Sequence, residues 1–218
     1  MWRVDLHAHT HESKDSLLAP ERLIAAARRA GLSRIAVTDH NSAHTALELA
    51  EREPEFVIPG EEILTTRGEL LAYFIREEVP PGLTPHVTIE RLRAQGAVIS
   101  VAHPFDRLRG GHWAMEDLEA IAPHVDAAEG FNARCLFAGD NTRAQAFARG
   151  RSLGMTAGTD AHAAWEVGRA GLALEPFANA SELRRALHRG TLFGRRAPWW
   201  VHFFSRYASL RKRLARQT

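Results

Sequence analysis

The sequence contains a single cysteine, Cys135, and no long apolar segment. One cysteine excludes a disulfide within the chain and is typical of proteins from a reducing compartment. We expect Cys135 to be a small buried residue, because no base lies near it in the sequence. No apolar run approaches the ~20 residues that a membrane-spanning helix needs, and the first residues do not resemble a secretion signal. These absences predict a soluble, cytoplasmic protein, and the 218 residues predict one globular body.

Acidic residues are absent from the last part of the chain. After Glu182 there are ten arginines and lysines and no aspartate or glutamate, although the net charge of the whole chain is only +2. The part up to Glu182 therefore carries 18 basic against 26 acidic side chains. An acidic body is expected if carboxylates are collected around metal ions, whereas the basic end either contacts phosphate groups or is simply solvated.

Short apolar or β-branched segments alternate with helical patterns along the chain. This alternation predicts β/α units and a mostly parallel sheet. We expect strands at residues 2–7, 34–38, 56–58, 70–75, 97–102, 125–130 and 155–158. We expect helices at residues 20–30, 43–52, 88–94, 115–121, 141–153 and 181–188.

Side chains that can bind metals follow five of these strands. In the first, the sequence Asp5-Leu6-His7-Ala8-His9 places two histidines on the same face, because alternate residues of a strand point the same way. The carboxyl ends of the strands form one face of a β/α barrel, so residues distant in sequence converge there. Burying so many ionisable groups without partners would cost several kcal/mol each. A shared divalent cation is the simplest explanation.

Five motifs together resemble those of the PHP (polymerase and histidinol phosphatase) family. In family order they are Asp5-Leu6-His7-Ala8-His9-Thr10, Val37-Thr38-Asp39-His40, Gly60-Glu61-Glu62-Ile63, Ala102-His103-Pro104 and Gly158-Thr159-Asp160-Ala161-His162. The resemblance extends over nearly the whole chain. It implies an α/β fold, a distorted (β/α)7 barrel with the metal site at the C-terminal ends of its strands. It also implies two to three divalent ions, which the sequence leaves open as manganese, zinc or iron.

Carried over residue by residue, the resemblance implies three sets of metal ligands. The first metal would take His7, His9, Glu62 and Asp160. Glu62 would bridge to a second metal, which also takes His103. Asp15, His40 and His162 resemble the ligands of the third.

Two positions depart from the family pattern. Glu69 stands where many members have a histidine, so it is either a carboxylate ligand that favours harder ions such as manganese or an exposed loop residue. Asp15 lies in Ser13-Lys14-Asp15-Ser16, where many members read Ser-Asp-Gly, and Glu12 is the alternative ligand. Beside the ligands, we expect Asp39 to orient a histidine by a hydrogen bond, although it could instead cap the following helix.

Substrate contacts are expected beside the strand ends that carry ligands. Arg107 and Arg134 either hold phosphate oxygens in bidentate fashion or make solvated pairs, with Glu129 as one partner. Asn132 would add a hydrogen bond to the same phosphate. His11 either protonates the leaving oxygen or is an exposed loop residue.

Residues 199–218 are expected to form a unit of their own after the barrel of residues 1–198. Apolar residues recur at helical spacing with arginines and a lysine around them, which predicts an amphipathic basic helix. They are Phe203, Tyr207, Leu210 and Leu214. Such a helix either packs on the barrel with its charges in water, clamps a nucleic acid backbone with Trp199 and Trp200 stacked on bases, or binds a membrane surface.

The resemblance implies a metal-dependent phosphoesterase in which a metal-bound water attacks phosphorus. Consistent with this, no serine or cysteine lies in a nucleophile motif. The implied substrates are nucleotide 3′,5′-bisphosphates or the 5′ ends of short RNA or DNA. Family members of that kind often carry an inserted domain between the fourth and fifth strands, whereas here only residues 76–95 separate them. The site is therefore more open or is covered by the basic C-terminal helix. A small-molecule phosphatase similar to histidinol phosphatase and a catalytically silent interaction module are the alternatives.

Overall fold

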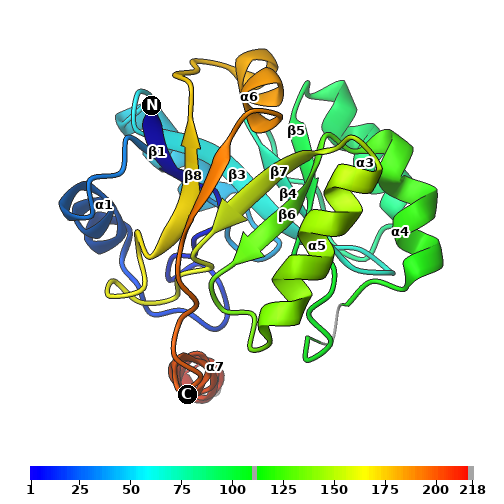
Figure 1. The fold of residues 1–218 in the computed structure, drawn as a ribbon. Coiled ribbons are helices and arrows are strands. Elements are labelled where there is room, and N and C mark those ends of the chain that lie inside the picture. Colours follow the sequence, from blue (N-terminus) through cyan, green and yellow to red (C-terminus); the bar gives the residue numbers. More distant parts are fainter. Residues whose placement is uncertain (110–111, 216–218) are drawn as a thin grey trace.

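The computed structural model describes residues 1–109 and 112–215, and a nine-stranded sheet forms their centre (Figure 1). Its strands are β1 (Trp2–Asp5), β2 (Arg34–Val37), β3 (Val57–Leu64), β4 (Glu69–Tyr73), β5 (Val98–Val101), β6 (Ala127–Asn132), β7 (Gly154–Gly158), β8 (Ala170–Leu174) and β9 (Thr191–Gly194). The order across the sheet is β7-β6-β5-β4-β3-β2-β1-β8-β9. All seven predicted strands are present, whereas β8 and β9 were not predicted.

The sheet curls into a distorted barrel that closes between β1 and β7. Beyond β1, the backbone N–H of Leu6 donates to the carbonyl oxygen of Ala157 at 3.1 Å, and that of Asp160 donates to His7 at 2.7 Å. The strands β1, β2 and β3 pair in parallel, as do β5, β6 and β7. The predicted distorted (β/α)7 barrel is thus confirmed.

Three strands depart from the mostly parallel sheet that was expected. The strand β4 runs antiparallel to β3, because the loop of residues 65–68 between them is too short for a parallel crossover and forms a hairpin. It also runs antiparallel to its other neighbour, β5. This hairpin also extends β3 to Leu64, well past the predicted end at residue 58, so Glu62 lies within a strand. The strand β8 pairs antiparallel with β1, and β9 pairs antiparallel with β8.

Helices cover the outer face of the barrel (Figure 1). They are α1 (Pro20–Arg29), α2 (His44–Arg52), α3 (Pro85–Ala94), α4 (Met115–Ile121), the 3₁₀ turn η1 (Ala122–His124), α5 (Ala138–Gly150) and α6 (Ala180–Leu187), whereas the last helix, α7 (Val201–Ala215), lies at one end of the barrel. The strands β2 and β5 are buried on both faces, which explains why their sequences are mostly apolar. Among the described residues, no helix is long and apolar enough to span a membrane.

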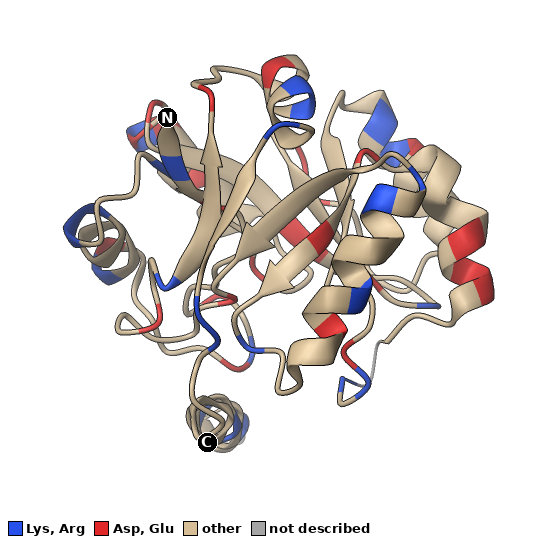
Figure 2. Ribbon diagram, viewed as in Figure 1, with Lys and Arg blue, Asp and Glu red and all other residues tan. Residues whose placement is uncertain are grey.

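The last helix, α7, lies at the end of the barrel toward which β6 and β7 run (Figure 1). It corresponds to the expected basic helix of residues 199–218, of which residues 216–218 lie outside the described part. Arginine and lysine residues occur along it and acidic residues do not (Figure 2). Its position places it beside the strand ends that carry the predicted metal ligands.

Candidate metal centre

His7 and His9 follow β1 and face each other at the mouth of the barrel. Both side chains are fully buried, and their Nε2 atoms are 3.1 Å apart. The Nδ1 atom of His7 lies 2.9 Å from Oε1 of Glu129. Because an ionised carboxylate only accepts hydrogen bonds, Nδ1 of His7 carries the proton of the neutral ring, and Nε2 directs a lone pair into the centre. Glu129 thus fixes the tautomer that a metal ligand needs.

Asp39 orients His9 through Ser13. The hydroxyl of Ser13 donates to Oδ1 of Asp39 at 2.6 Å, so it accepts from Nδ1 of His9, which lies 3.1 Å away. The other carboxylate oxygen of Asp39 accepts from the Thr10 hydroxyl at 2.6 Å. The alternative role of capping α2 does not apply, since the cap residue is Ala43 without a side-chain hydrogen bond. His9 therefore also presents Nε2 as an acceptor.

Two carboxylates face these imidazoles. Oε2 of Glu62 lies 3.3 Å from Nε2 of His7 and 3.4 Å from Nε2 of His9. Oδ1 of Asp160 lies 3.2 Å from the same atom of His9. Neither oxygen has a hydrogen-bond partner among the described residues, although both are buried. The four residues predicted for the first metal are thus brought together.

Glu62 also contacts the residues predicted for a second ion. Its Oε1 atom lies 2.8 Å from Nε2 of His103, and that nitrogen lies 3.5 Å from Oε2 of Glu69. The backbone of His103 has φ = 24°, and that of Asp160 has φ = 53°, which is a strained conformation for residues other than glycine. Backbone conformations of this kind are often found at functional sites.

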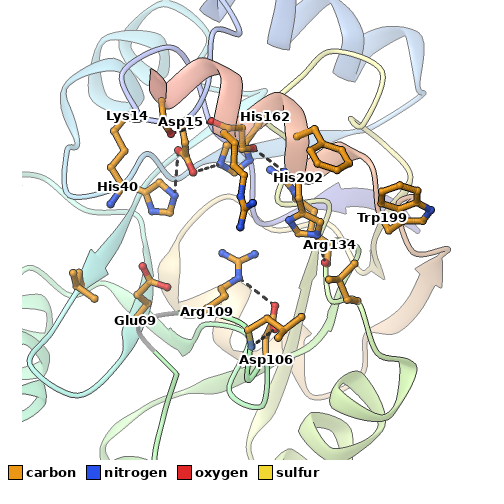
Figure 3. A pocket seen from close by; sticks show the side chains of 17 residues that line it. Lys14, Asp15, His40, Glu69, Asp106, Arg109, Arg134, His162, Trp199 and His202 are labelled. Atoms are coloured by element: carbon orange, nitrogen blue, oxygen red, sulfur yellow. Dashed lines mark hydrogen bonds and ion pairs between the residues drawn. The ribbon is translucent and has the colours of Figure 1, made fainter. Parts of the chain in front are cut away.

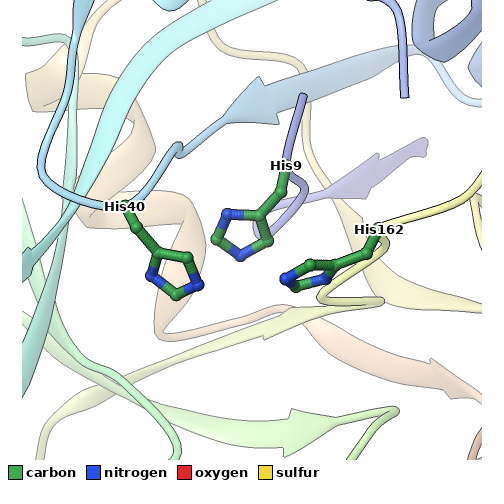
Figure 4. Close-up of side chains that lie close together, drawn as sticks. All are labelled: His9, His40 and His162. Atoms are coloured by element: carbon green, nitrogen blue, oxygen red, sulfur yellow. The ribbon is translucent and has the colours of Figure 1, made fainter. Parts of the chain in front are cut away.

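The third predicted set gathers around Asp15. Its two oxygens lie 3.2 Å from Nε2 of His162 and 3.6 Å from Nε2 of His40. Nδ1 of His162 donates to the backbone carbonyl of Asp160 at 2.8 Å, so its Nε2 atom is also an acceptor. The rings of His9, His40 and His162 converge on one small space (Figure 4), with centroids 4.3 Å apart for His9 and His162.

The electrostatic balance keeps Glu62, Asp160 and His9 in the states that bind metals. Burial would raise the pKa of Glu62, but the facing His7 and His40 outweigh it and hold this pKa well below its usual value. Burial would likewise raise the pKa of Asp160, but the guanidinium of Arg109 and His7 outweigh it and hold this pKa well below its usual value. Burial, together with its histidine neighbours, lowers the pKa of His9 well below its usual value. The carboxylates are therefore ionised and His9 is neutral.

The donor atoms fit divalent cations. Three groups each have ligand atoms within 4.8 Å of one another, and they are His7, His9 and Glu62; His40, Glu62 and Glu69; and His9, His40 and His162. Buried ligand-type atoms without a hydrogen-bond partner in the described chain face this region. Mixed imidazole and carboxylate donors suit manganese, iron or zinc.

Comparison with known proteins agrees with this geometry. Residues 5–58 match the PHP domain family, and residues 138–192 match the PHP-associated family. An uncharacterized protein of Methanocaldococcus jannaschii is 38% identical over 172 residues, which cover 77% of this chain and 68% of that protein. The chain belongs to the PHP family.

Solved structures share the PHP fold at low sequence identity. A two-domain protein of Bacteroides vulgatus, described as containing a predicted PHP-like metal-dependent phosphoesterase, superposes with a TM-score of 0.72 at 20% identity. The match covers 89% of this chain and 65% of that protein, so this chain spans less than two thirds of it. PsfC of Pseudomonas syringae gives a TM-score of 0.68 at 21% identity, over 100% of this chain and 99% of PsfC. The lesion-specific endonuclease EndoQ of Pyrococcus furiosus gives 0.62 at 17% identity, over 88% of this chain and 57% of that one.

Above the histidines of this PHP chain, a cavity of about 850 Å³ opens between the strand ends and α7 (Figure 3). Its walls include the predicted ligands Asp15, His40, Glu69 and His162. Arg109 also lines it and forms ion pairs with Asp160 and, at 3.3 Å, with Asp106.

Of the predicted substrate contacts Arg107, Arg134 and His11, only Arg134 is among the described residues that line the cavity. Arg134 lines the cavity, but its Nη2 atom donates to the hydroxyl of Ser205 at 2.7 Å. The guanidinium of Arg107 lies over the ring of Phe137, 5.9 Å from its centroid. His11 is exposed. Neither Arg107 nor His11 is among the described residues that line the cavity.

Asn132 contacts carboxylates in this structure. Its side-chain amide donates to Oδ2 of Asp160 and to Oε2 of Glu129, each at 3.1 Å, and it is fully buried. It therefore holds a predicted ligand in place, and a substrate phosphate would have to compete with two carboxylates for it.

Sequence reasoning missed Arg109 and gave Glu129 a different partner. Arg109 lies in the segment that follows His103, and nothing in the sequence set it apart from the nearby Arg107. Glu129 was identified at the end of a strand as a partner for an arginine, whereas it binds His7. The sequence did carry a signal for this role of Glu129, which is an acidic residue at the end of a largely apolar predicted strand.

Proposed function

We propose that this PHP protein is a metal-dependent phosphoesterase. The observation that carries the proposal is the convergence of two buried carboxylate oxygens, Oε2 of Glu62 and Oδ1 of Asp160, on the Nε2 atoms of His7 and His9. Buried carboxylate oxygens that have no hydrogen-bond partner in the described part of the chain are costly in a protein unless a cation meets them. A silent interaction module is disfavoured because every predicted ligand position keeps a suitable residue.

Nine side chains would hold two to three divalent ions, manganese, zinc or iron. They are His7, His9, Asp15, His40, Glu62, Glu69, His103, Asp160 and His162. When bound, such ions supply the Lewis acidity that neutralises phosphoryl oxygens and activates a water molecule as the nucleophile. Asp39, through Ser13, and Glu129 hold two of the imidazoles in the required tautomer.

The chain itself supplies the cation that meets the transferred phosphoryl group. Arg109 lies in the cavity next to Asp160, so its guanidinium can donate to phosphate oxygens beside the ions. Arg134 is bound to α7 and stabilises the cavity wall. Cys135 is no nucleophile, because burial raises its pKa above the ordinary range of a thiol.

The substrates that fit best are nucleotide 3′,5′-bisphosphates or the 5′ ends of short RNA or DNA. The cavity of about 850 Å³ is far larger than a phosphate group needs. The fold shared with EndoQ, described as an endonuclease, is consistent with a nucleic acid substrate. With a nucleic acid substrate, the basic residues of α7 would contact the nucleic acid. A small-molecule phosphatase similar to histidinol phosphatase is the second candidate function.

The test is hydrolysis of a panel of phosphate esters with and without added manganese. The panel contains an aryl phosphate, adenosine 3′,5′-bisphosphate, histidinol phosphate and a 5′-phosphorylated tetranucleotide. We expect manganese-dependent release of phosphate or nucleotide from the wild type and a loss of at least hundredfold in His9→Ala. His44→Ala, at the exposed start of α2, is the matched control and should keep full activity. Absence of turnover on the whole panel in metal-loaded protein would reject the proposal.

A further inference from the structure

The C-terminal helix α7 is fixed to the segments that hold the predicted metal ligands. At its start, Nη2 of Arg134 donates to the carbonyl of Val201 at 3.2 Å and to the hydroxyl of Ser205 at 2.7 Å. Toward its end, Nζ of Lys212 donates to the carbonyl of Ser13 at 2.7 Å, the residue that orients His9. Because both halves of the helix are bound to these segments, α7 forms one wall of the site.

One face of α7 lines the cavity. His202, Arg206 and Ser209 are spaced by four and three residues, so they project from the same side of the helix. Trp199 and Phe203 complete this wall near the start of the helix. The surface thus combines a guanidinium, an imidazole, a hydroxyl and two larger aromatic rings.

Arg206 is the cation of this wall. Its guanidinium makes no ion pair or hydrogen bond with any other side chain that the structure describes, whereas Arg109 and Arg134 are both engaged. Lys14, the other basic residue of the lining that has no ion pair in the described chain, lies beside His40 (Figure 3) and so next to the predicted ligands. Arg206 is therefore suited to a second anionic group, away from the phosphate at the ions.

The rings of this wall are open to a ligand. Trp199 is 66% exposed and Phe203 is 57% exposed, although both border the cavity. Exposed aromatic faces next to a cation are the surface on which a nucleobase stacks.

We propose that α7 is the substrate-recognition wall of this enzyme, with Arg206 binding a second phosphate and Trp199, whose ring is held edge-to-face against Phe203 at an interplanar angle of 73°, stacking on the base. The wall would select a nucleotide that carries two separated phosphates over a nucleoside monophosphate. This inference rests on the proposed function for the hydrolysed phosphate, but the selectivity of binding can be measured without any turnover.

The test measures equilibrium binding of adenosine 3′,5′-bisphosphate and of AMP by calorimetry, on the metal-loaded full chain. Arg206→Gln removes the charge. Arg211→Gln, on the same helix but outside the cavity lining, is the matched control. A charge-assisted contact to phosphate predicts that Arg206→Gln weakens bisphosphate binding about tenfold or more and AMP binding less than threefold, with Arg211→Gln unchanged. The same split is expected in KM, with kcat nearly constant.

Equal weakening by Arg206→Gln and Arg211→Gln would overturn the inference, since it would indicate only a diffuse field of charge. Equal weakening of both nucleotides by Arg206→Gln, no effect of this variant, or no preference of the wild type for the bisphosphate would also overturn it. Selective binding that depends on Arg206, without hydrolysis of any ester, would uphold the wall and reject the phosphoesterase. Hydrolysis of the aryl phosphate without selective binding of the bisphosphate would uphold the phosphoesterase and reject the wall.

Discussion

The Nε2 atoms of His7 and His9 face each other across 3.1 Å, while both Nδ1 atoms are already bonded to Glu129 and Ser13. Two lone pairs at this distance repel unless a cation lies with them. In the metal-free chain, burial would lower the pKa of His7, but Glu62 and the other facing carboxylates outweigh it and raise this pKa well above its usual value, so a proton takes that place. The centre is therefore built around positive charge.

Removal of the ions should destabilise the fold. Ligands that bind only the native state stabilise it by about 4 kcal/mol when present at a thousand times their dissociation constant. We expect chelator treatment to lower the midpoint of thermal unfolding by several degrees, and added manganese or zinc to restore it. A midpoint that does not respond to either treatment would contradict a centre that gathers segments from β1, β3 and β7.

Ser13→Ala should weaken metal binding without changing any predicted ligand. The hydroxyl of Ser13 joins Asp39 to His9, and loss of such an outer hydrogen bond typically lowers metal affinity about 10- to 100-fold. Competition with a fluorescent chelator measures this affinity. Ser181→Ala, on the exposed start of α6, is the control and should bind as the wild type does. Wild-type affinity in Ser13→Ala would show that His9 needs no support.

Glutamine substitutions of Arg109 and of Arg107 are predicted to affect kcat differently. If Arg109 meets the phosphoryl group, Arg109→Gln should lower kcat about 10²- to 10³-fold, as loss of one donor to the transition state does elsewhere. Arg107→Gln should change kcat less than threefold, because its guanidinium lies over Phe137. Steady-state hydrolysis of one substrate by both variants decides between them, and the reverse order would restore the sequence-based prediction.

Gly158 marks the seam where the barrel closes. A Cβ atom at Gly158 would lie 2.3 Å from Cβ of His7 and 2.6 Å from its backbone nitrogen, so the two strands would have to separate. Gly158→Ala should cost about 2 kcal/mol or more of unfolding free energy. Gly139→Ala, in α5 with nothing within 4 Å of the added atom, should stabilise by about 0.5–1 kcal/mol. Urea unfolding of both variants tests the difference, and equal stabilities would refute the close approach at the seam.

The sequence allowed prediction of the elements whose signals are local. His7 and His9 alternate along one strand, and the spacing of the later motifs identified the family and its barrel. The extension of β3 through Glu62 was missed because Pro59 and Gly60 read as the end of a strand, whereas the hairpin with β4 continues it. The strand β8 was missed because its partner, β1, is about 170 residues away in the sequence.

Side-chain roles near the cavity depended on contacts that spacing does not encode. Arg107 and Arg109 are two residues apart in one loop, and only the path of that loop decides which one meets Asp160. The position of α7 likewise depends on Arg134 reaching Ser205, 71 residues further along the chain. Such long-range contacts are formed by packing and not by local propensity.

Metal content is the measurement that tests the central claim most directly. The chain should be loaded with manganese, zinc or iron, dialysed, and analysed by mass spectrometry beside the double variant His7→Ala, His9→Ala. We predict two to three ions per wild-type chain and a loss of at least one in the variant. Less than one ion per wild-type chain with all three metals would contradict the account.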